Sequence, residues 1–186
     1  MRLLFAATLT VAIAAIAPAE DKKGTLVELA GLKSTTPADW KEEPPSNSMR
    51  MMQFKMPKAE GDPDDAELAL FKTPGGGAMQ ANLERQEKKF ELPTGKKAED
   101  VIKTEKIKIG TNEAVYQDIQ GIYLKKFPPN DPNAKITKVP DYRQLYVIFE
   151  VKEGEKTTLY SMTLLGPTKT IEKHKKAFTE WLKSFK

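Results

Sequence analysis

Apolar and polar residues alternate in the first half of the chain, and this pattern predicts β-strands. Between residues 49 and 56, Met52, Phe54 and Met56 fall on one face, whereas polar residues lie nearer the other. Alternation of this kind is typical of a strand with one buried face. Residues 66–72 are apolar on both faces, which predicts a central strand.

Two further pairs of strands are separated by short turns and predict β-hairpins. Residues 101–109 and 114–124 flank a turn at 110–112, and residues 142–151 and 157–165 flank a charged turn at 152–156. A short strand is also predicted over residues 26–29. Five tyrosines stand on the hairpins, where they either line a groove or pack with their hydroxyls at the rim: Tyr116, Tyr123, Tyr142, Tyr146 and Tyr160.

Helical periodicity appears twice. Residues 78–90 carry a stripe at spacings of four, three and four, formed by Met79, Leu83, Gln86 and Phe90. The end of the chain predicts an amphipathic helix that Thr168 or Thr170 could cap. Its apolar stripe consists of Ile171, His174, Phe178, Trp181, Leu182 and Phe185.

The remaining long segment, residues 125–140, carries four prolines and predicts a loop. Because it is longer than most loops, it is a candidate functional loop. We expect an α+β fold in which an antiparallel β-sheet of about six to seven strands is flanked by helices. No internal repeat is visible, so we expect a single α+β domain over residues 20–186.

The first 19 residues resemble a signal peptide. One positive charge precedes an apolar run, and Ala17-Pro18-Ala19 forms a small-x-small cleavage site. The run is short for a membrane span, so we expect no stable membrane insertion after signal removal. The chain has no Cys. Export without disulfides indicates a bacterial protein, periplasmic or extracellular.

Charge argues against one class of partner. Removing Arg2 from the 30 basic residues leaves 29 against 26 acidic residues, and only three of those 29 are Arg. The lysines are scattered among Glu and Asp. Nucleic-acid-binding proteins usually cluster basic residues and use Arg for phosphate and base contacts, so we expect no nucleic-acid partner.

A glycine run precedes the first predicted helix and raises the question of phosphate binding. Gly75, Gly76 and Gly77 are followed by Ala78-Met79, where a Walker loop needs Gly-Lys-Ser/Thr. The glycines are also consecutive, unlike those of a Rossmann fingerprint. Free N–H groups at a helix start favour an anion, and Arg85 could assist. The structural alternative is a strand-to-helix link that needs positive φ.

Other candidate ligands do not form a recognised motif. The sole His, His174, lies on an apolar stripe and is read as an edge-of-core residue. Four carboxylates at Asp62, Asp64, Asp65 and Glu67 suit calcium in type, but the EF-hand spacing is absent, so a solvated turn is the alternative.

A run of methionines suggests a thioether copper site, but alternation would send its members to both faces of a strand. They are Met49, Met51, Met52 and Met56. We therefore expect no metal and no cofactor, and assign no catalytic residue.

Several of these features occur together in a known group. They are Pro37-Ala38-Asp39-Trp40 after a short strand, a strand ending in Pro57, the Gly75–Gly77 turn before a helix, and Gly166-Pro167-Thr168 before the last helix. Together they resemble uncharacterised exported bacterial proteins with a PsbP-like fold. An aromatic residue often follows the Arg of the helix in those proteins, where this chain has Gln86.

The resemblance implies an antiparallel sheet sandwiched by helices that serves largely as a non-catalytic scaffold. The best-known members of the fold are extrinsic subunits of the photosynthetic oxygen-evolving complex. The shared motifs are structural, so the resemblance implies no functional residue and no photosynthetic role.

The leading hypothesis is an exported non-catalytic binding or accessory module. Its partner would be an envelope protein, an envelope polymer or a small ligand, bound at the sheet end near the Gly-rich turn and the Pro-rich loop. One alternative is a hydrolase with a carboxylate-based site, which requires two carboxylates to converge. Another is a small-anion receptor formed by Gly75, Gly76, Gly77 and Arg85. The oligomeric state stays open.

Overall fold

A computed structural model describes residues 23–128, 131 and 133–186. The predicted signal peptide, residues 1–19, lies outside the described residues. The strands are β1 (Leu26–Leu29), β2 (Leu32–Thr35), β3 (Lys41–Glu43), β4 (Arg50–Met56), β5 (Ala66–Pro74), β6 (Phe90–Glu91), β7 (Ile102–Ile109), β8 (Asn112–Phe127), β9 (Lys135–Glu153) and β10 (Lys156–Pro167). The helices are α1 (Met79–Glu87), α2 (Ala98–Val101) and α3 (Thr168–Lys183).

The predicted α+β class with an antiparallel sheet is confirmed. Eight strands form one sheet in the order β3-β4-β5-β10-β9-β8-β6, and β7 pairs with another part of β8. β1 and β2 form a separate two-stranded sheet. Every pairing is antiparallel. The strands that the sequence did not predict, such as β3 and β6, are short and lie at the edges.

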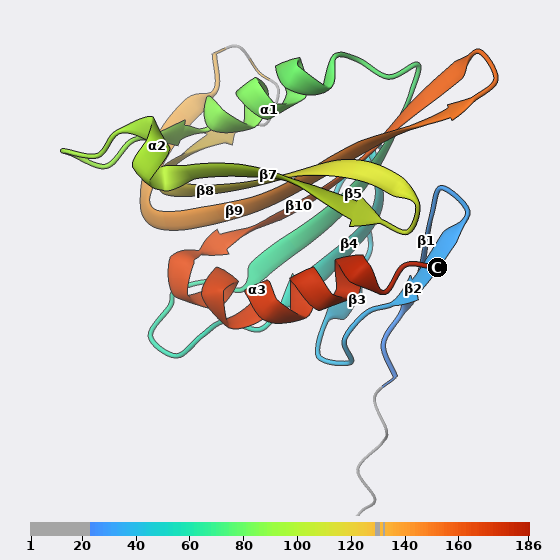
Figure 1. Cartoon of the computed structure of the whole chain (residues 1–186). Helices are drawn as coiled ribbons and strands as arrows, with labels where there is room; N and C mark the ends of the chain where they lie inside the picture. The colour runs from blue at the N-terminus through green and yellow to red at the C-terminus, as the bar shows by residue number, and fades with distance from the viewer. Residues whose placement is uncertain (1–22, 129–130, 132) are drawn as a thin grey trace, which may run out of the picture.

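The main sheet is the middle of three layers (Figure 1). α1 lies on one face, where Leu83 packs in a small cluster with Tyr146 and Ile148. α3 and the β1–β2 hairpin lie on the other face and cover the larger cluster, which includes Leu68, Leu70, Leu145, Val147, Phe149, Met162 and Leu164. Neighbouring residues of β9 serve different clusters because side chains alternate along a strand.

The last helix forms as predicted because its apolar stripe matches the helical period. Ile171, Phe178 and Trp181 are buried against the sheet, and the Trp181 ring also packs edge-on against Trp40. The cap differs from the prediction: no side chain caps the helix from Pro167, its N-cap. Instead, the Asp62 carboxylate accepts hydrogen bonds from the backbone N–H and hydroxyl of Thr170.

Two predicted boundaries are wrong. The helix predicted over residues 78–90 ends at Glu87, because Phe90 and Glu91 turn to pair with Tyr123 and Ile122 of β8. Most of the predicted loop at 125–140 is strand: β8 extends to Phe127 and β9 begins at Lys135, and the two remain paired. Proline tolerance at edges and strand ends permits this extension.

Lys186 is hydrogen-bonded to β2 of the small hairpin. Lys33 of β2 and Lys186 exchange two backbone hydrogen bonds, of 2.8 and 3.1 Å. Figure 1 shows the C-terminus beside the β1–β2 hairpin. Among the described residues, no helix is both long and apolar enough to cross a membrane.

Candidate functional site

The predicted Gly-rich turn joins β5 to α1. Gly75, Gly76 and Gly77 all have positive φ, at 81°, 68° and 155°, as the structural alternative requires. The Gly75 N–H donates to the carbonyl of Thr157, and the Gly76 N–H donates to the carbonyl of Thr73. Two of the N–H groups that an anion would need are therefore already bonded to the backbone.

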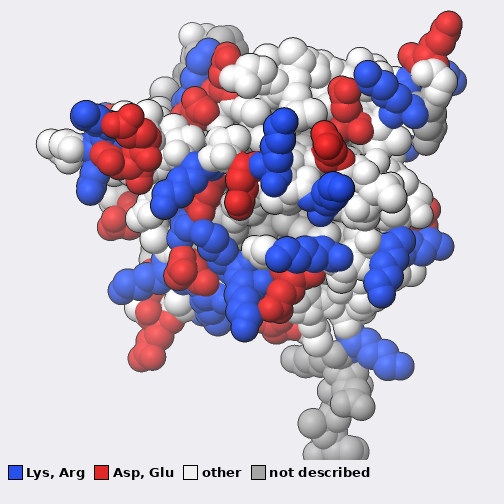
Figure 2. All heavy atoms as spheres, viewed as in Figure 1, with Lys and Arg blue, Asp and Glu red and all other residues white. Residues whose placement is uncertain are grey.

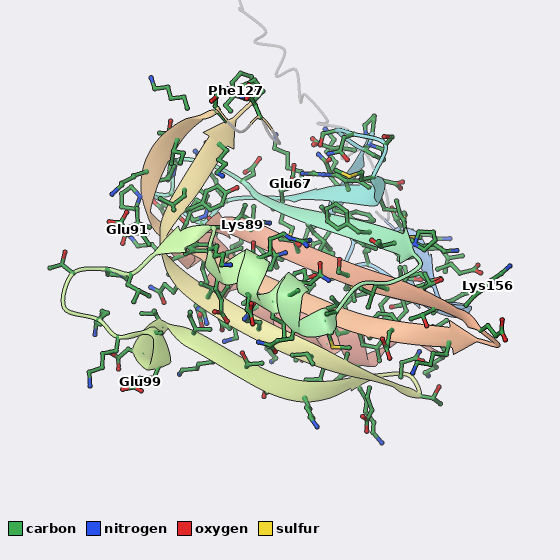
Figure 3. The ribbon with its side chains drawn as sticks, turned by 90° about the horizontal axis from the view of Figure 1, so that it is seen from above. Glu67, Lys89, Glu91, Glu99, Phe127 and Lys156 are labelled. Carbon is green, nitrogen blue, oxygen red and sulfur yellow. The ribbon has the colours of Figure 1, made fainter. Side chains whose placement is uncertain are left out.

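Arg85 lies on the exposed side of α1, where its guanidinium donates to the Asn82 side chain one turn earlier. Anion binding by Gly75–Gly77 and Arg85 stays a prediction. The expectation that the turn shares a sheet end with the Pro-rich segment is wrong. The turn adjoins the start of β10, whereas Phe127 lies at the far end of the β8–β9 pair, opposite Lys156 (Figure 3).

The four clustered carboxylates point to different partners. Asp62 caps α3, and Asp64 accepts a hydrogen bond from the Tyr142 hydroxyl. Asp65 accepts from the backbone N–H of Lys58, and Glu67 pairs with Arg50. Among the residues that the structure describes, no group of three or more His, Cys, Asp or Glu side chains could hold a metal ion.

His174 and the methionines do not gather into a metal site among the described residues. The His174 ring is buried, and its Nε2 lies 2.9 Å from the carbonyl oxygen of Pro57. Met56 is in the core, whereas Met49 and Met51 are exposed. Alternation on β4 therefore places these methionines on different faces of the strand, as the sequence predicts.

A narrow cleft of about 310 Å³ lies between the edge strand β7 and α3. Its walls are largely apolar and include Ile107 from β7 and Leu182 from α3. The other lining residues are Glu105, Lys108, Tyr116, Lys175, Thr179 and Lys183. Among the described strands β7 pairs with β8 alone, so the described sheet ends at β7 beside the cleft.

Tyr116 gives the cleft its unusual chemistry. It lies on β8, opposite Glu105 of β7, and only 5% of its surface is exposed. Its hydroxyl is buried and has no hydrogen-bond partner among the described residues. Burial, and then the negative charge of Asp118, raise the pKa of the Tyr116 hydroxyl, so this group stays protonated. A buried hydroxyl without a partner costs about 1–3 kcal/mol of stability.

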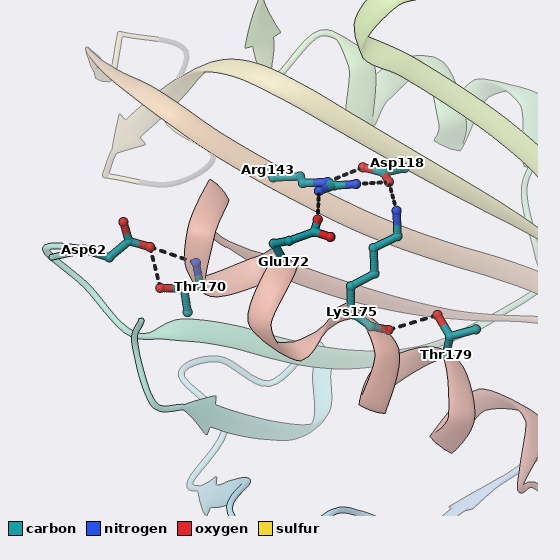
Figure 4. Close-up of polar contacts among 7 residues, drawn as sticks. All are labelled: Asp62, Asp118, Arg143, Thr170, Glu172, Lys175 and Thr179. Carbon is teal, nitrogen blue, oxygen red and sulfur yellow. Dashed lines mark hydrogen bonds and ion pairs between the residues drawn. The ribbon is translucent and has the colours of Figure 1, made fainter. Parts of the chain in front are cut away.

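A buried ion-pair network lies beside the cleft (Figure 4). Arg143 of β9 donates two hydrogen bonds to the Asp118 carboxylate, of 2.7 and 2.6 Å, and also pairs with Glu172 of α3. Lys175, which lines the cleft, donates to Asp118 over 2.9 Å. Burial opposes the charge of Asp118, but these two partners outweigh it and hold its pKa below the ordinary value.

Lysines outnumber acids in the cleft lining. Lys108, Lys175 and Lys183 face a single carboxylate, that of Glu105. Figure 2 views this side of the molecule and shows basic side chains interspersed with acidic ones around the region between β7 and α3. The charge of Lys175 is partly compensated by Asp118, whereas Lys108 and Lys183 stand at the surface.

Two larger hollows are more open than the cleft. Among the described residues, neither is lined by an unpartnered polar side chain as deeply buried as Tyr116. One, of about 720 Å³, lies by β3 and β4 and is lined by Ala38, Asp39, Lys41, Lys55, Pro57 and Asp65. The other, of about 600 Å³, lies at the start of α3, where Asp62 and Tyr142 are already bonded. Its Thr168 hydroxyl has no partner in the described structure, but that residue is only half-buried.

Tyr116 is one of the five tyrosines that the sequence places on hairpins, and nothing in the sequence singles it out. The distinguishing signal is three-dimensional: β7, β8 and α3 must meet before the hydroxyl is isolated. We therefore take the β7–α3 cleft, defined by its eight lining residues, as the candidate site.

Known proteins match this chain in structure only. No family model matches the sequence, and no curated protein matches it. Among solved structures, it is similar to LpqN of Mycobacterium tuberculosis, described as involved in cell envelope biogenesis. The TM-score is 0.52 at 11% identity, over 88% of this chain and 84% of LpqN. This likeness shows a shared fold.

Proposed function

We propose that the chain is an exported, non-catalytic binding or accessory module of the bacterial cell envelope. The signal-peptide pattern of residues 1–19 supports export. The fold similarity to LpqN, a protein described as involved in cell envelope biogenesis, supports a role in the cell envelope. In this proposal the module binds a small, partly apolar ligand in the β7–α3 cleft. That ligand would be a part of an envelope protein or polymer, or a free small molecule.

The observation that carries the proposal is an apolar cleft whose lining includes Tyr116, a buried tyrosine with an unpartnered hydroxyl. Small-molecule sites combine a mainly hydrophobic concave surface with a few placed polar groups, and about 310 Å³ is at the lower end of their range. A protein that keeps an unpaired buried hydroxyl gives up stability, which is understandable if a ligand supplies the partner.

The hydrolase alternative receives less support. A carboxylate-based mechanism needs one carboxylic acid kept protonated near a second, ionised one. Asp118 is the described carboxyl most deeply placed beside the cleft, and its pKa is lowered, with its oxygens held by Arg143 and Lys175. Glu105, the acid that lines the cleft, has no second carboxylate in the lining.

The test is occupancy of the cleft by a small environment-sensitive dye, 2-naphthol, whose two fused rings fit a cleft of about 310 Å³. We expect saturable fluorescence with residues 20–186. The variant Thr179→Phe should remove most of it, because a bulky ring there fills the cleft wall. Glu180→Phe is the matched control: it places the same ring on an exposed position of α3 outside the lining. Equal dye binding by both variants would contradict the proposal.

A further inference from the structure

We infer that the β7–α3 cleft selects a small amphipathic anion: a carboxylate head on an apolar body of about eight carbons. The inference rests on the proposed function and names the ligand class for that site. The volume of about 310 Å³ equals roughly ten waters at their share of liquid volume. A carboxylate with eight carbons has about that number of non-hydrogen atoms.

The head of the ligand is assigned to the part of the cleft lined by two residues that carry donors, Tyr116 and Lys175. The Tyr116 hydroxyl stays protonated, so it can donate to an anionic oxygen. Lys175 has three N–H donors, and its contact with Asp118 uses one. The Tyr116 hydroxyl lacks an acceptor among the described residues, Lys175 has N–H groups besides the one that Asp118 accepts, and a carboxylate supplies two oxygens. An ammonium head would supply none.

The charge of the head is tolerated because the neighbouring network is already balanced. Arg143 and Lys175 face Asp118 and Glu172, so these four groups sum to zero. Lys108 and Lys183 then exceed Glu105 by one positive charge in the lining. A single anionic head therefore brings the cleft close to neutrality, whereas a cationic head would add to an existing excess.

The body of the ligand is placed by the apolar walls. Ile107 and Leu182 stand on opposite sides, on β7 and α3, and the aliphatic stems of the lysines extend the apolar surface. A linear chain can follow the gap between a strand and a helix. Burying each methylene group improves affinity about fourfold at the usual transfer free energy.

The experiment compares three ligands with the same eight-carbon body by calorimetric titration of residues 20–186. They are octanoate, octanol and octyltrimethylammonium. We expect octanoate to bind most tightly and the cation not to bind measurably. Tyr116→Phe removes only the hydroxyl and should weaken octanoate roughly 10- to 100-fold. Tyr160→Phe, a buried tyrosine of the same core cluster outside the lining, is the control and should change little.

The outcomes separate the two claims. Octanoate and octanol binding equally, with Thr179→Phe blocking both, would overturn the anion class and leave the binding module intact. No binding of any ligand or of the dye would overturn both. Octanoate binding that Tyr116→Phe does not weaken would show that the hydroxyl does not contact the ligand and would overturn the assigned head position. Circular dichroism melts of each variant establish that it is folded.

Discussion

The most informative change to this protein is the removal of Arg143 from its buried network. Only 13% of its side chain and 8% of that of Asp118 are exposed. Arg143→Met keeps much of the volume of the aliphatic stem but leaves Asp118 with Lys175 as its remaining basic partner. The double variant Asp118→Asn/Arg143→Met also removes the buried negative charge that Arg143→Met leaves without its main partner. Glu172→Gln removes only the exposed partner of Arg143.

The magnitude follows from burial. Breaking a buried ion pair on one side costs about 3–5 kcal/mol, because the other charge is left without compensation. Lys175 remains, so we expect about 3 kcal/mol for Arg143→Met. The double variant should recover about 1–2 kcal/mol of this loss. Glu172 is 66% exposed, and its replacement should cost less than about 1 kcal/mol.

The assay is urea denaturation at several pH values. The pKa of Asp118 is lowered in the folded state, so its contribution is present above the unfolded value near 3.8. It is lost as pH falls through the lower folded value. The stability gap between the wild type and Arg143→Met should therefore be full at pH 7 and shrink below about pH 4. A gap under about 1 kcal/mol at pH 7, or one that stays constant to pH 3, would refute this reasoning.

Three further changes test other parts of the structure. Tyr116→Phe should leave stability unchanged or raise it by up to about 1 kcal/mol in thermal melts, because the lost hydroxyl has no described partner; a clear loss would reveal one. Burial, and then the charge of Arg85, lower the pKa of Lys89 to about 8, so Lys89→Met should be more stable at pH 7 by up to about 3 kcal/mol. That advantage should fade between pH 8 and 10.5, where unfolded wild type holds a proton on Lys89 that the folded protein has lost. An advantage that denaturant titrations show to be independent of pH would contradict the lowered pKa of Lys89. Asp62→Ala should cost about 1–2 kcal/mol by uncapping α3. It is measured against Asp64→Ala, which removes the acceptor of the half-buried Tyr142 hydroxyl and leaves the helix cap in place.

Local patterns were enough to predict the sheet and the last helix. The alternation of β4 and the apolar run of β5 follow from which faces are buried, and Ile171, Phe178 and Trp181 follow from the helical period. The extension of β8 beyond residue 124 and the start of β9 at residue 135 were not predictable, because proline and polar residues there argue for a loop. The strands continue because each supplies the other's backbone hydrogen-bond partners.

The candidate cleft depended on contacts that no local pattern contains. Tyr116 lies in a largely buried stretch of β8, so its sequence context resembles that of any core tyrosine. Its hydroxyl is isolated only because α3, more than fifty residues later, covers the same face. The capping of α3 by Asp62 was missed for the same reason: the sequence predicted a local Thr cap, and a distant carboxylate provides it.

The pairing of Lys33 with Lys186 constrains the order in which the core can close. Alone, a two-stranded hairpin is marginally stable in water. Val27 and Leu29 of this hairpin belong to the same core cluster as Phe178 of α3 and Phe185, which follows that helix. Synthesis delivers the hairpin well before these partners. A nascent chain therefore leaves Val27 and Leu29 without them until α3 has been made, so this part of the core closes only after that helix.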